Sequence, residues 1–575
     1  MHNCLSLDVF TALHGGEILY RSAKILMGET RAETRSLFKS MGYTENELTN
    51  RPLIGIVNSW STLVPGHFNL RELASYVEKG IYRAGGTAVE FGVISACDGI
   101  ANGHDGMKYI LPSREVICNS IEIEAQAHQL DGLILLASCD KIVPGMLMAA
   151  ARLNIPAILV NGGPMLGGDT FDGRCADATS NDEALGMFKS GRISVETLHQ
   201  VENSCCPGCG SCSFYGTANT MGCVAEALGM SLPGSALIPA VYAERKQAAF
   251  DAGRQICHLV EQGITARDVM DERAIRNAVR IVQTTSGSTN AALHLSAIAN
   301  EAELPIRVMD VFGEQYPETP ILVKVNPSSA YNMEEFYKAG GIPRTMRCLG
   351  DLIDGTAMTC TGKTVAENLA AFHPTHPENP EIIRDRAHAY QSSGGVAVLR
   401  GNLAELSAIT KPGAYAPELR HFTGTARVFD REEAANDAIL RGEITPQTIL
   451  VIRYEGPKGG PGMREMYKAM KYLYGQGLAK STAVITDGRF SGTNNSCFVG
   501  HISPEAAEGG TIALVEDGDS VEIDVDAGVL TLHVDNAELE RRRQAWKAPD
   551  LYIPKGYLRS YARLASSADQ GAVLH

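Results

Sequence analysis

The stretch Leu133-Ile-Leu-Leu-Ala-Ser-Cys-Asp-Lys141 joins five apolar residues to a polar segment that contains a cysteine and an aspartate. An apolar run without alternation predicts a β-strand that is buried on both faces, as in the middle of a parallel sheet. In parallel α/β sheets the ligand lies beyond the carboxyl ends of the strands. The stretch therefore predicts the fold class and also the edge of the sheet at which a site should lie.

The surrounding sequence repeats this pattern of strand and helix. Further strands are expected at Leu53–Val57, Ala88–Val93 and Ile155–Val160, and helices at Asn69–Arg83, Arg114–Gln129, with Ser113 as N-cap, and Met146–Leu153. Such alternation predicts an α/β domain whose parallel strands have few polar residues and are buried on both faces. The segments expected at the carboxyl edge are Asn58–His67, Ala96–Gly106 and Ser138–Gly145.

A second domain is expected after the proline-rich stretch His373-Pro-Thr-His-Pro-Glu-Asn-Pro380, which is the best linker candidate. Beyond about Ser393, short apolar runs separated by Gly and Asp predict a β-rich barrel or sandwich with a few helices. These runs are Val396–Leu399, Ile449–Arg453, Ala483–Thr486, Ile512–Val515, Val521–Val525 and Val529–Val534. The predicted domains are residues 1–380 and 381–575.

Composition narrows the class of protein. The chain has 575 residues, more than one compact core usually holds, and its formal net charge of −15 argues against binding to nucleic acid or to an anionic membrane. No apolar run approaches the roughly 20 residues of a membrane span, and the first thirty residues do not resemble a secretion signal. A cytoplasmic location is therefore expected, where clustered members of the 14 cysteines should be metal or redox ligands.

Cysteines are densest in Cys205-Cys-Pro-Gly-Cys-Gly-Ser-Cys212, which contains a C-x₂-C-x₂-C run. This spacing is typical of iron–sulfur ligation, with zinc as the competing metal. The pair Cys139-Asp140 places a soft ligand beside a hard one at the end of a predicted strand. The alternative for this pair is a buried cysteine next to a surface ion pair.

Two polar segments of the second domain are further candidates for parts of a binding site. Gly456–Glu465 is a glycine-rich loop expected to lead into a helix, where its N–H groups would hold a carboxylate and Glu465 would bind a hard metal. Asp487-Gly-Arg-Phe-Ser-Gly-Thr493 follows the predicted strand Ala483–Thr486. The alternative for both segments is a structural turn.

Together, motifs from about Arg21 to about Arg541 strongly resemble the dihydroxy-acid dehydratase/6-phosphogluconate dehydratase family. The motifs are Asn58–Trp60, Asp98–Ile100, His104–Met107, Cys139–Lys141, Cys212 with Gly216–Asn219, Gly287–Asn290, Gly462–Glu465, Asp487–Ser491 and Val499–Glu505. The resemblance implies an α/β domain joined to an aconitase-like swivelling β-barrel domain, in a homodimer or a dimer of dimers. It also implies an iron–sulfur cluster and Mg²⁺.

The resemblance assigns roles to individual residues. Cys139 and Cys212 match cluster ligands, Ser491 matches the base that removes the C2 proton, and the magnesium ligands would be Asp98, Asp140, Lys141 and Glu465. An ammonium group cannot bind a cation, and in the family this lysine is carbamylated by CO₂, which gives it a carboxylate-like oxygen.

The chain departs from the family at Pro65-Gly66-His67, where many members have a cysteine that supplies another cluster ligand. The third ligand is therefore open between Cys209 and His67, and the cluster between [2Fe-2S] and [4Fe-4S].

The expected reaction is dehydration of a 2,3-dihydroxy carboxylic acid to a 2-keto acid, with a branched acid of valine and isoleucine synthesis as the first candidate substrate. A sugar acid such as an aldonate is the alternative, supported by Ser213–Asn219 and by Asn494-Asn495. A hypothesis from another functional class is a non-catalytic zinc or thiol-redox protein built on Cys206–Cys212. That hypothesis leaves Asp98, Glu465 and Ser491 unexplained.

Overall fold

A four-stranded parallel sheet forms the centre of the amino-terminal half, in a computed structural model that describes residues 20–415, 417–491, 496–550, 553 and 555–575. The strand order is β2-β1-β3-β4, and every neighbouring pair is parallel. The strands are β1 (Leu53–Asn58), β2 (Thr87–Gly92), β3 (Gly132–Ala137) and β4 (Ala157–Asn161). The predicted parallel α/β architecture is confirmed.

Burial differs between the middle and the edge of this sheet. Every residue of β1, β3 and β4 is buried, whereas β2 alternates between more and less exposed residues after its first two positions. The prediction of strands buried on both faces is thus wrong for β2. As an edge strand it has a neighbour on one side only, and Glu90 and Gly92 reach solvent.

The predicted crossover helices are present with shifted ends. They are α4 (Leu70–Arg83), α6 (Ile110–Ala127) and α7 (Ile142–Leu153). Ser113 does not cap α6, because the helix begins three residues earlier and the Ser113 hydroxyl donates to the carbonyl of Ile110 over 2.7 Å. Pro112 is tolerated there, since the first turn of a helix needs no backbone N–H donor.

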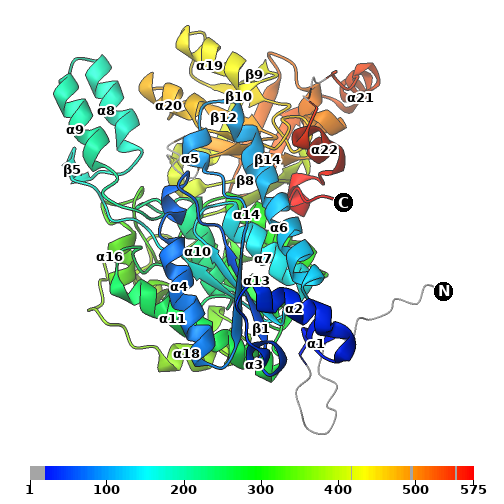
Figure 1. Ribbon diagram of the computed structural model, residues 1–575. Coiled ribbons are helices and arrows are strands. Elements are labelled where there is room, and N and C mark those ends of the chain that lie inside the picture. Colours follow the sequence, from blue (N-terminus) through cyan, green and yellow to red (C-terminus); the bar gives the residue numbers. More distant parts are fainter. Residues whose placement is uncertain (1–19, 416, 492–495, 551–552, 554) are drawn as a thin grey trace.

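A helical layer that the sequence analysis did not anticipate follows the sheet. It runs as α8 (Ser180–Lys189), α9 (Val195–Ser204), α10 (Thr217–Ala227), α11 (Ala243–Gln262), α12 (Ala266–Val269), α13 (Glu272–Thr284), α14 (Asn290–Glu301), α15 (Val308–Gln315), α16 (Met333–Lys338), α17 (Gly341–Leu349) and α18 (Val365–Ala371). Many are buried on most sides and so lack a clear polar face in their sequence. The pair α8 and α9 projects from the body, preceded by the short strands β5 (Thr170–Phe171) and β6 (Arg174–Cys175) (Figure 1).

The second half forms a closed barrel in the order β10-β12-β14-β8-β7-β16-β15-β9, which confirms the predicted β-rich domain. Its strands are β7 (Ala397–Gly401), β8 (Ala404–Thr410), β9 (His421–Phe429), β10 (Thr448–Ile452), β12 (Ala483–Thr486), β14 (Cys497–Ser503), β15 (Ser520–Asp524) and β16 (Val529–His533). The predicted strand Ile512–Val515 is wrong. Thr511–Leu514 is a short 3₁₀ helix whose apolar residues are buried without a strand partner.

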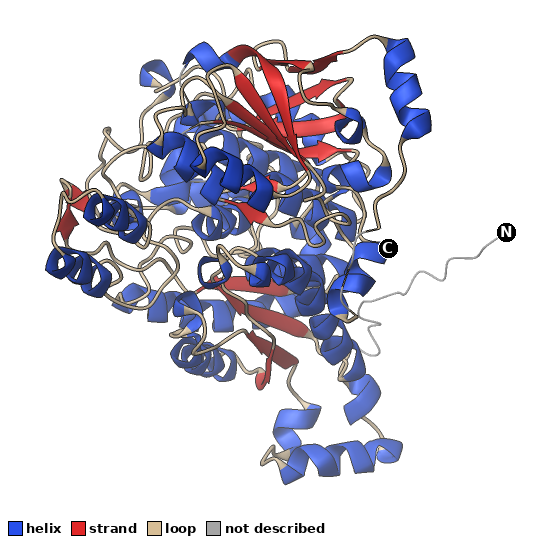
Figure 2. Cartoon of the chain, turned by 90° about the horizontal axis from the view of Figure 1, so that it is seen from above, coloured by secondary structure: helices blue, strands red, loops and turns tan. Residues whose placement is uncertain are grey.

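The remaining helices lie at the barrel and near the start of the chain. Those at the barrel are α19 (Glu432–Leu440), α20 (Lys468–Gly475), α21 (Asn536–Ala545) and α22 (Tyr557–Leu564), and those near the start are α1 (Ala23–Leu26), α2 (Ala32–Ser40) and α3 (Glu45–Thr49). Figure 2 shows the strands of the barrel and those of the parallel sheet as two separate groups, with helices around and between them. We place the proposed domain boundary, between residues 380 and 381, in a segment without helix or strand.

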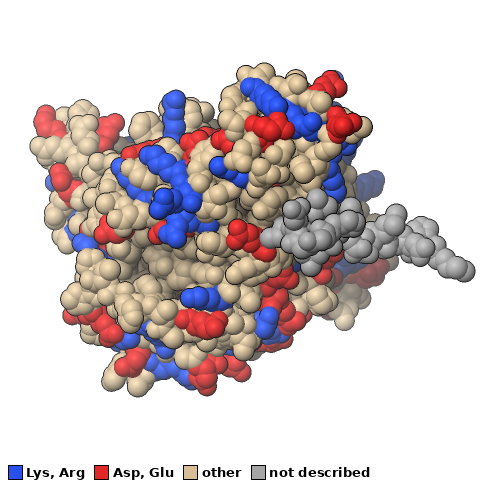
Figure 3. Space-filling model, turned by 60° about the horizontal axis from the view of Figure 1, so that its bottom comes forward, with Lys and Arg blue, Asp and Glu red and all other residues tan. Residues whose placement is uncertain are grey.

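The two halves share packed contacts. The largest hydrophobic cluster lies on one face of the parallel sheet and also includes Val396, Val398 and Ile409 from the start of the barrel half. On the face shown in Figure 3, acidic and basic side chains are interspersed. Within the described part of the chain, no helix has both the length and the apolar character needed to cross a membrane.

Candidate active site

Two Cys-Asp pairs lie at the carboxyl edge of the parallel sheet. Cys139-Asp140 comes one residue after β3 ends, and Cys97-Asp98 follows β2 at the start of the short helix α5 (Asp98–Ala101). Because β2, β1 and β3 run parallel side by side, these ends meet at one edge. Each of the two pairs therefore supplies one soft ligand and one hard ligand at this edge.

Three cysteine sulfurs gather at this edge. Burial raises the pKa of Cys139 well above its ordinary value, and the charge of Cys97 raises it next. The pKa of Cys212 is raised in the same way by burial, then by Asp98 and Cys97. The pKa of Cys97 itself rises to about 11, first by burial and then by Asp98. The structure thus brings Cys139 and Cys212 together, as predicted, and adds Cys97.

Sequence reasoning missed Cys97, although a signal was present. Cys97-Asp98 repeats the Cys139-Asp140 dipeptide after a neighbouring strand, and only its carboxylate was taken as a candidate. Cys212 is positioned from the other side, by the helix α10. Asn219 on that helix donates to the carbonyls of Cys212 and Phe214 over 2.5 and 2.8 Å, which holds the turn that carries the sulfur.

The two candidates for a third cluster ligand, His67 and Cys209, differ in burial and in their neighbours. His67 is fully buried, with Nδ1 2.8 Å from the carbonyl oxygen of Ser59 and Nε2 accepting from the backbone N–H of Cys139 over 3.1 Å. Both ring nitrogens are therefore used within the protein. Cys209 is half-buried, and the only charged neighbour that shifts its pKa is Glu72, on α4, rather than the other thiols.

The predicted magnesium ligands also come together. The pKa of Asp98 rises to about 7, first by burial and then by Asp140 and Glu465, while Lys141 opposes the rise. Lys141 forms an ion pair with Asp140 through Oδ2. The other carboxylate oxygen of Asp140 is buried and has no hydrogen-bond partner among the described residues. Two carboxylates close enough to raise the pKa of a third form, with it, an arrangement that a divalent cation would stabilise.

Glu465 and Ser491 are carried by a small two-stranded element, not by a helix. The strand β11 (Glu465–Met466) pairs in parallel with β13 (Arg489–Phe490), so Glu465 lies opposite Arg489. The backbone N–H of Ser491 donates to the carbonyl of Met466 over 3.1 Å. A helix follows the loop as expected, but α20 begins only at Lys468, after β11.

Side chains from the helical layer hold Glu465 in place. Arg489 Nη1 and Asn290 Nδ2 each donate to Glu465 Oε2 over 2.9 Å, and Arg489 also donates to Asn290 Oδ1 over 2.9 Å. Asn290 is the first residue of α14, so this triangle spans the two halves of the chain. The barrel thus presents Glu465 to the carboxylates of the parallel sheet.

The glycine-rich loop before Glu465 holds a carboxylate of the protein itself. The backbone N–H groups of Lys458 and Gly459 donate to the two carboxylate oxygens of Glu505 over 2.9 and 2.8 Å. The expectation that this loop binds an external carboxylate at a helix end is therefore wrong. Asp487 is also structural, because its oxygens accept from the backbone of Tyr454, Glu455 and Ala506.

Several buried donors near Lys141 lack a partner among the described residues. They are Nε2 of His294, Nε2 of His501 and Nη2 of Arg489. Burial and, after it, the charges of Arg489 and Lys141 lower the pKa of His501 to about 3. The same two cations contribute to the lowered pKa of His294, after burial. A negatively charged group at Lys141 would find hydrogen-bond donors on this side.

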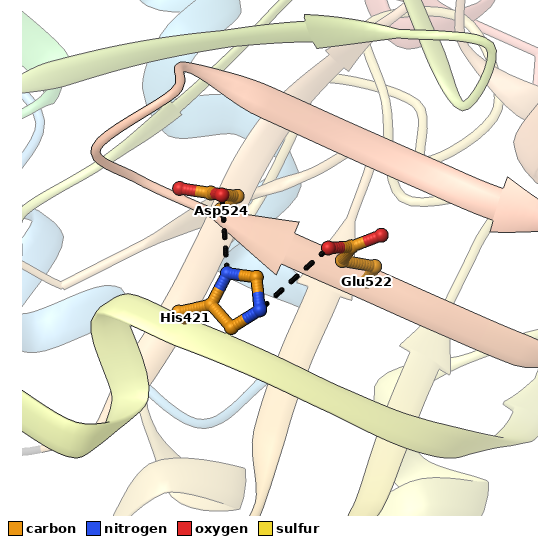
Figure 4. Close-up of side chains that lie close together, drawn as sticks. All are labelled: His421, Glu522 and Asp524. Carbon is orange, nitrogen blue, oxygen red and sulfur yellow. Dashed lines mark hydrogen bonds and ion pairs between the residues drawn. The ribbon is translucent and has the colours of Figure 1, made fainter.

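Outside this site, His421, Glu522 and Asp524 lie close together on the outer face of the barrel (Figure 4). His421 lies directly opposite Asp524 across β9 and β15, with Nδ1 3.1 Å from Oδ2, and its side chain is 63% exposed. We interpret these contacts as cross-strand ion pairs of an exposed sheet.

The ligand atoms of this exposed trio lie closer to one another than the three thiol sulfurs do as a group. Among the described residues this trio is the only group of three His, Cys, Asp or Glu whose ligand atoms all lie within 4.8 Å of one another. The sulfurs of Cys97, Cys139 and Cys212 therefore do not all lie within that distance of one another.

Two predictions from the sequence fall partly outside the described residues. Asn494 and Asn495, which favour a sugar acid, lie there, as do Gly492 and Thr493 directly after Ser491. Ser491 itself is described and half-buried.

The chain is similar to known proteins over nearly its whole length. Residues 51–368 match the family model for the dihydroxy-acid/6-phosphogluconate dehydratase N-terminal domain, and residues 381–572 match that for the C-terminal domain. The chain is 48% identical over 556 residues to proteins named dihydroxy-acid dehydratase from Acetivibrio thermocellus and Ruminiclostridium cellulolyticum. These alignments cover 96% of this chain and 99% or 100% of the relatives. The chain therefore belongs to the dihydroxy-acid/6-phosphogluconate dehydratase family.

Proposed function

We propose that this dehydratase removes water from a branched 2,3-dihydroxy carboxylic acid and produces a 2-keto acid for branched-chain amino-acid synthesis. The full-length similarity to proteins named dihydroxy-acid dehydratase supports the reaction and the substrate class. One observation carries the proposal for the site. Thiols and carboxylates from both halves of the chain converge at one edge of the sheet, in pairs that separate soft from hard ligands.

An iron–sulfur cluster fits the thiols. Cys139 and Cys212 would hold it, and the cluster would be [2Fe-2S] or [4Fe-4S]. Mg²⁺ fits the carboxylates Asp98, Asp140 and Glu465, because their mutual repulsion and the unpartnered buried oxygen of Asp140 are what a cation would relieve. Bound there, the two metal centres would supply Lewis acidity at the hydroxyl and carboxylate oxygens of the substrate.

Lys141 would join the magnesium ligands as a carbamate. Its neutral amine would attack the carbon of CO₂, and loss of a proton would leave a group with two oxygens and one negative charge. The buried donors of His294, His501 and Arg489 support this reading, because they have no acceptor among the described residues. Buried donors are rarely left unpaired in native proteins.

Ser491 would take the proton from C2. Its backbone is tied to Met466, directly after Glu465, so the hydroxyl is carried next to a proposed magnesium ligand. A serine hydroxyl is too weak an acid to act as a base by itself, and nearby cations would lower its pKa. Loss of the C2 proton and of the C3 hydroxyl would leave an enol, which tautomerises to the 2-keto acid.

A homodimer or dimer of dimers is part of this proposal. Leu63 and Phe68, in the segment that follows β1, are 74% and 58% exposed, and Trp60 in the same segment is 39% exposed. Exposed apolar side chains that lie together are typical of a contact between subunits. The cytoplasmic location stays a prediction from the sequence.

Formation of 2-keto acid tests the proposed substrate. Anaerobically purified enzyme with iron, sulfide and Mg²⁺ would be assayed with a branched 2,3-dihydroxy acid and with a panel of aldonates. The proposal expects kcat/KM to be highest for the branched acid. A higher value for an aldonate would replace the substrate and keep the reaction, and no product from any of these acids would contradict both.

A further inference from the structure

We propose that Cys97 is a third protein ligand of the iron–sulfur cluster. This inference rests on the proposed function, because it requires a cluster at Cys139 and Cys212. It concerns the position at which this chain departs from its family, where Gly66 stands in the Pro65-Gly66-His67 segment.

The neighbouring positions reach the thiols but do not provide a third sulfur. A Cβ atom built on Gly66 would lie 3.1 Å from the sulfur of Cys139, so the loop after β1 reaches the thiols without contributing one. The next residue, His67, uses both ring nitrogens within the protein. Cys209 has Glu72 as its charged neighbour instead of the other thiols.

Cys97 reaches the same edge of the sheet from the segment after β2. It is the N-cap residue of α5, and its side chain packs against the core cluster that contains Cys139. Of the charged groups that raise the pKa of Cys139, Cys97 has the largest effect, and it is also among those that act on Cys212. Cys97 therefore lies near both predicted ligands, at the edge of the sheet where β2 and β3 end.

The surroundings of Cys97 also suit a metal-bound thiolate. Backbone N–H groups of Ile100 and Gly99 stabilise its charged form, and a Cβ on Gly99 would lie 3.7 Å from its sulfur. Hydrogen bonds to the sulfurs are a common feature of iron–sulfur sites. Asp98, directly after it, faces the proposed magnesium ligands, so one dipeptide serves both metals in the same way as Cys139-Asp140.

Cys206 is the rival third thiol. Its charge raises the pKa of Cys212, but it is exposed, and its own sulfur lies 3.8 Å from that of Cys205. Cys97 raises the pKa of both predicted ligands and packs, partly buried, against the core cluster that contains Cys139, so it is the better candidate.

Spectroscopy on the intact chain tests this assignment. Cys97→Ser, Cys97→Ala, Cys206→Ser and Cys209→Ser would be purified anaerobically and reconstituted alongside the wild type, with Cys348→Ser as a distant control. The readouts are iron and sulfide per chain, the visible spectrum and the electron paramagnetic resonance (EPR) spectrum of the reduced protein. We expect Cys97→Ala to lower bound iron at least about two-fold, and Cys97→Ser to lower it or to shift the EPR g values. The other three variants should match the wild type.

A second variant separates loss of a ligand from misfolding. Gly66→Cys added to Cys97→Ala places a new thiol next to Cys139 and should restore cluster content. Wild-type iron and an unchanged EPR spectrum in both Cys97 variants would overturn the proposal, as would loss of the cluster in Cys206→Ser or Cys209→Ser alone. Cys139→Ser and Cys212→Ser test the proposed function separately. Retention of the cluster in both would refute the site itself, whereas its loss there with retention in Cys97→Ala would refute only this inference.

Discussion

The backbone N–H of Cys139 donates a hydrogen bond to Nε2 of His67 over 3.1 Å, and the other ring nitrogen of His67 lies 2.8 Å from the carbonyl oxygen of Ser59. The imidazole is therefore neutral, with its proton on Nδ1. It ties the loop after β1 to the first thiol after β3, although the two residues are 72 positions apart in the chain. A histidine that looks like a ligand in the sequence is thus a positioning residue in the fold.

This role predicts how stability depends on pH. Burial lowers the pKa of His67 to about 4, below the ordinary value of 6.5. The unfolded chain therefore takes up a proton between about pH 6.5 and 4 that the folded chain does not, so this contribution to stability is complete above pH 6.5 and is lost as the pH falls toward 4. One such proton corresponds to a slope of about 1.4 kcal/mol per pH unit.

The variant His67→Gln measures this contribution. The difference in thermal unfolding midpoint between wild type and variant should be largest at pH 7.5 and shrink steadily toward pH 4.5. His373→Gln, at an exposed position, should show no such trend. A difference that stays constant over this range would mean that the ring can be charged in the folded protein.

Ser491→Ala tests the proposed base. General bases usually contribute 10²–10⁴-fold to rate, so turnover should fall by at least about a hundredfold. Cluster and magnesium content should stay at wild-type levels, because the substitution keeps the backbone hydrogen bond that ties residue 491 to Met466. Ser520→Ala, on an exposed barrel strand, is the control. Turnover within a few-fold of wild type, at equal iron content, would remove Ser491 from the mechanism.

The divalent cation can be removed separately from the cluster. Glu465→Gln keeps an acceptor for Asn290 and Arg489 but removes a negative charge from the carboxylate group. We expect magnesium affinity to weaken and turnover to be lost, with the visible spectrum of the cluster unchanged. EDTA treatment of the wild type should have the same effect and be reversed by Mg²⁺. Full activity in a demetallated enzyme with an intact cluster would show that the magnesium site is misassigned, and the exposed Glu418→Gln provides the matched control.

The proposed carbamate on Lys141 predicts a dependence on dissolved CO₂. Enzyme dialysed in CO₂-free buffer should lose activity and recover it with bicarbonate. Carbon-13 magnetic resonance after addition of labelled bicarbonate should show a carbamate signal that is absent in Lys141→Arg. His501→Gln should weaken that signal if its buried Nε2 donates to the new group. An enzyme that remains fully active without CO₂, and shows no such signal, would leave Lys141 as an ammonium paired with Asp140.

Much of the fold follows from local patterns in the chain. Leu133–Ala137 is buried on both faces and lies inside β3, and Ala483–Thr486 is β12 residue for residue, because a run of apolar residues has few alternatives to a buried strand. The prediction of a strand at Ile512–Val515 was wrong for a related reason. Apolar residues in a short buried turn produce the same pattern, and only a neighbouring strand decides between the two.

For the site, the residue types were predictable and the contacts were not. The dipeptide Cys139-Asp140 and the motif at Glu465 could be recognised in the sequence, because soft and hard ligands are chosen by residue type. Whether His67 faces a metal or a backbone N–H depends on how the loops after β1 and β3 approach each other. No local pattern carries that information.

The sequence by itself therefore determined the parallel sheet, the β-rich second half, the family resemblance and the chemical kinds of ligand. The tertiary structure alone decided that Cys97 joins Cys139 and Cys212, that His67 is fully occupied, and that Asn290 and Arg489 hold Glu465 against the sheet. The physical reason is distance along the chain. Burial and strand formation depend on neighbouring residues, whereas these contacts join segments from 24 to 175 positions apart and exist only once the sheet, the helical layer and the barrel have packed together.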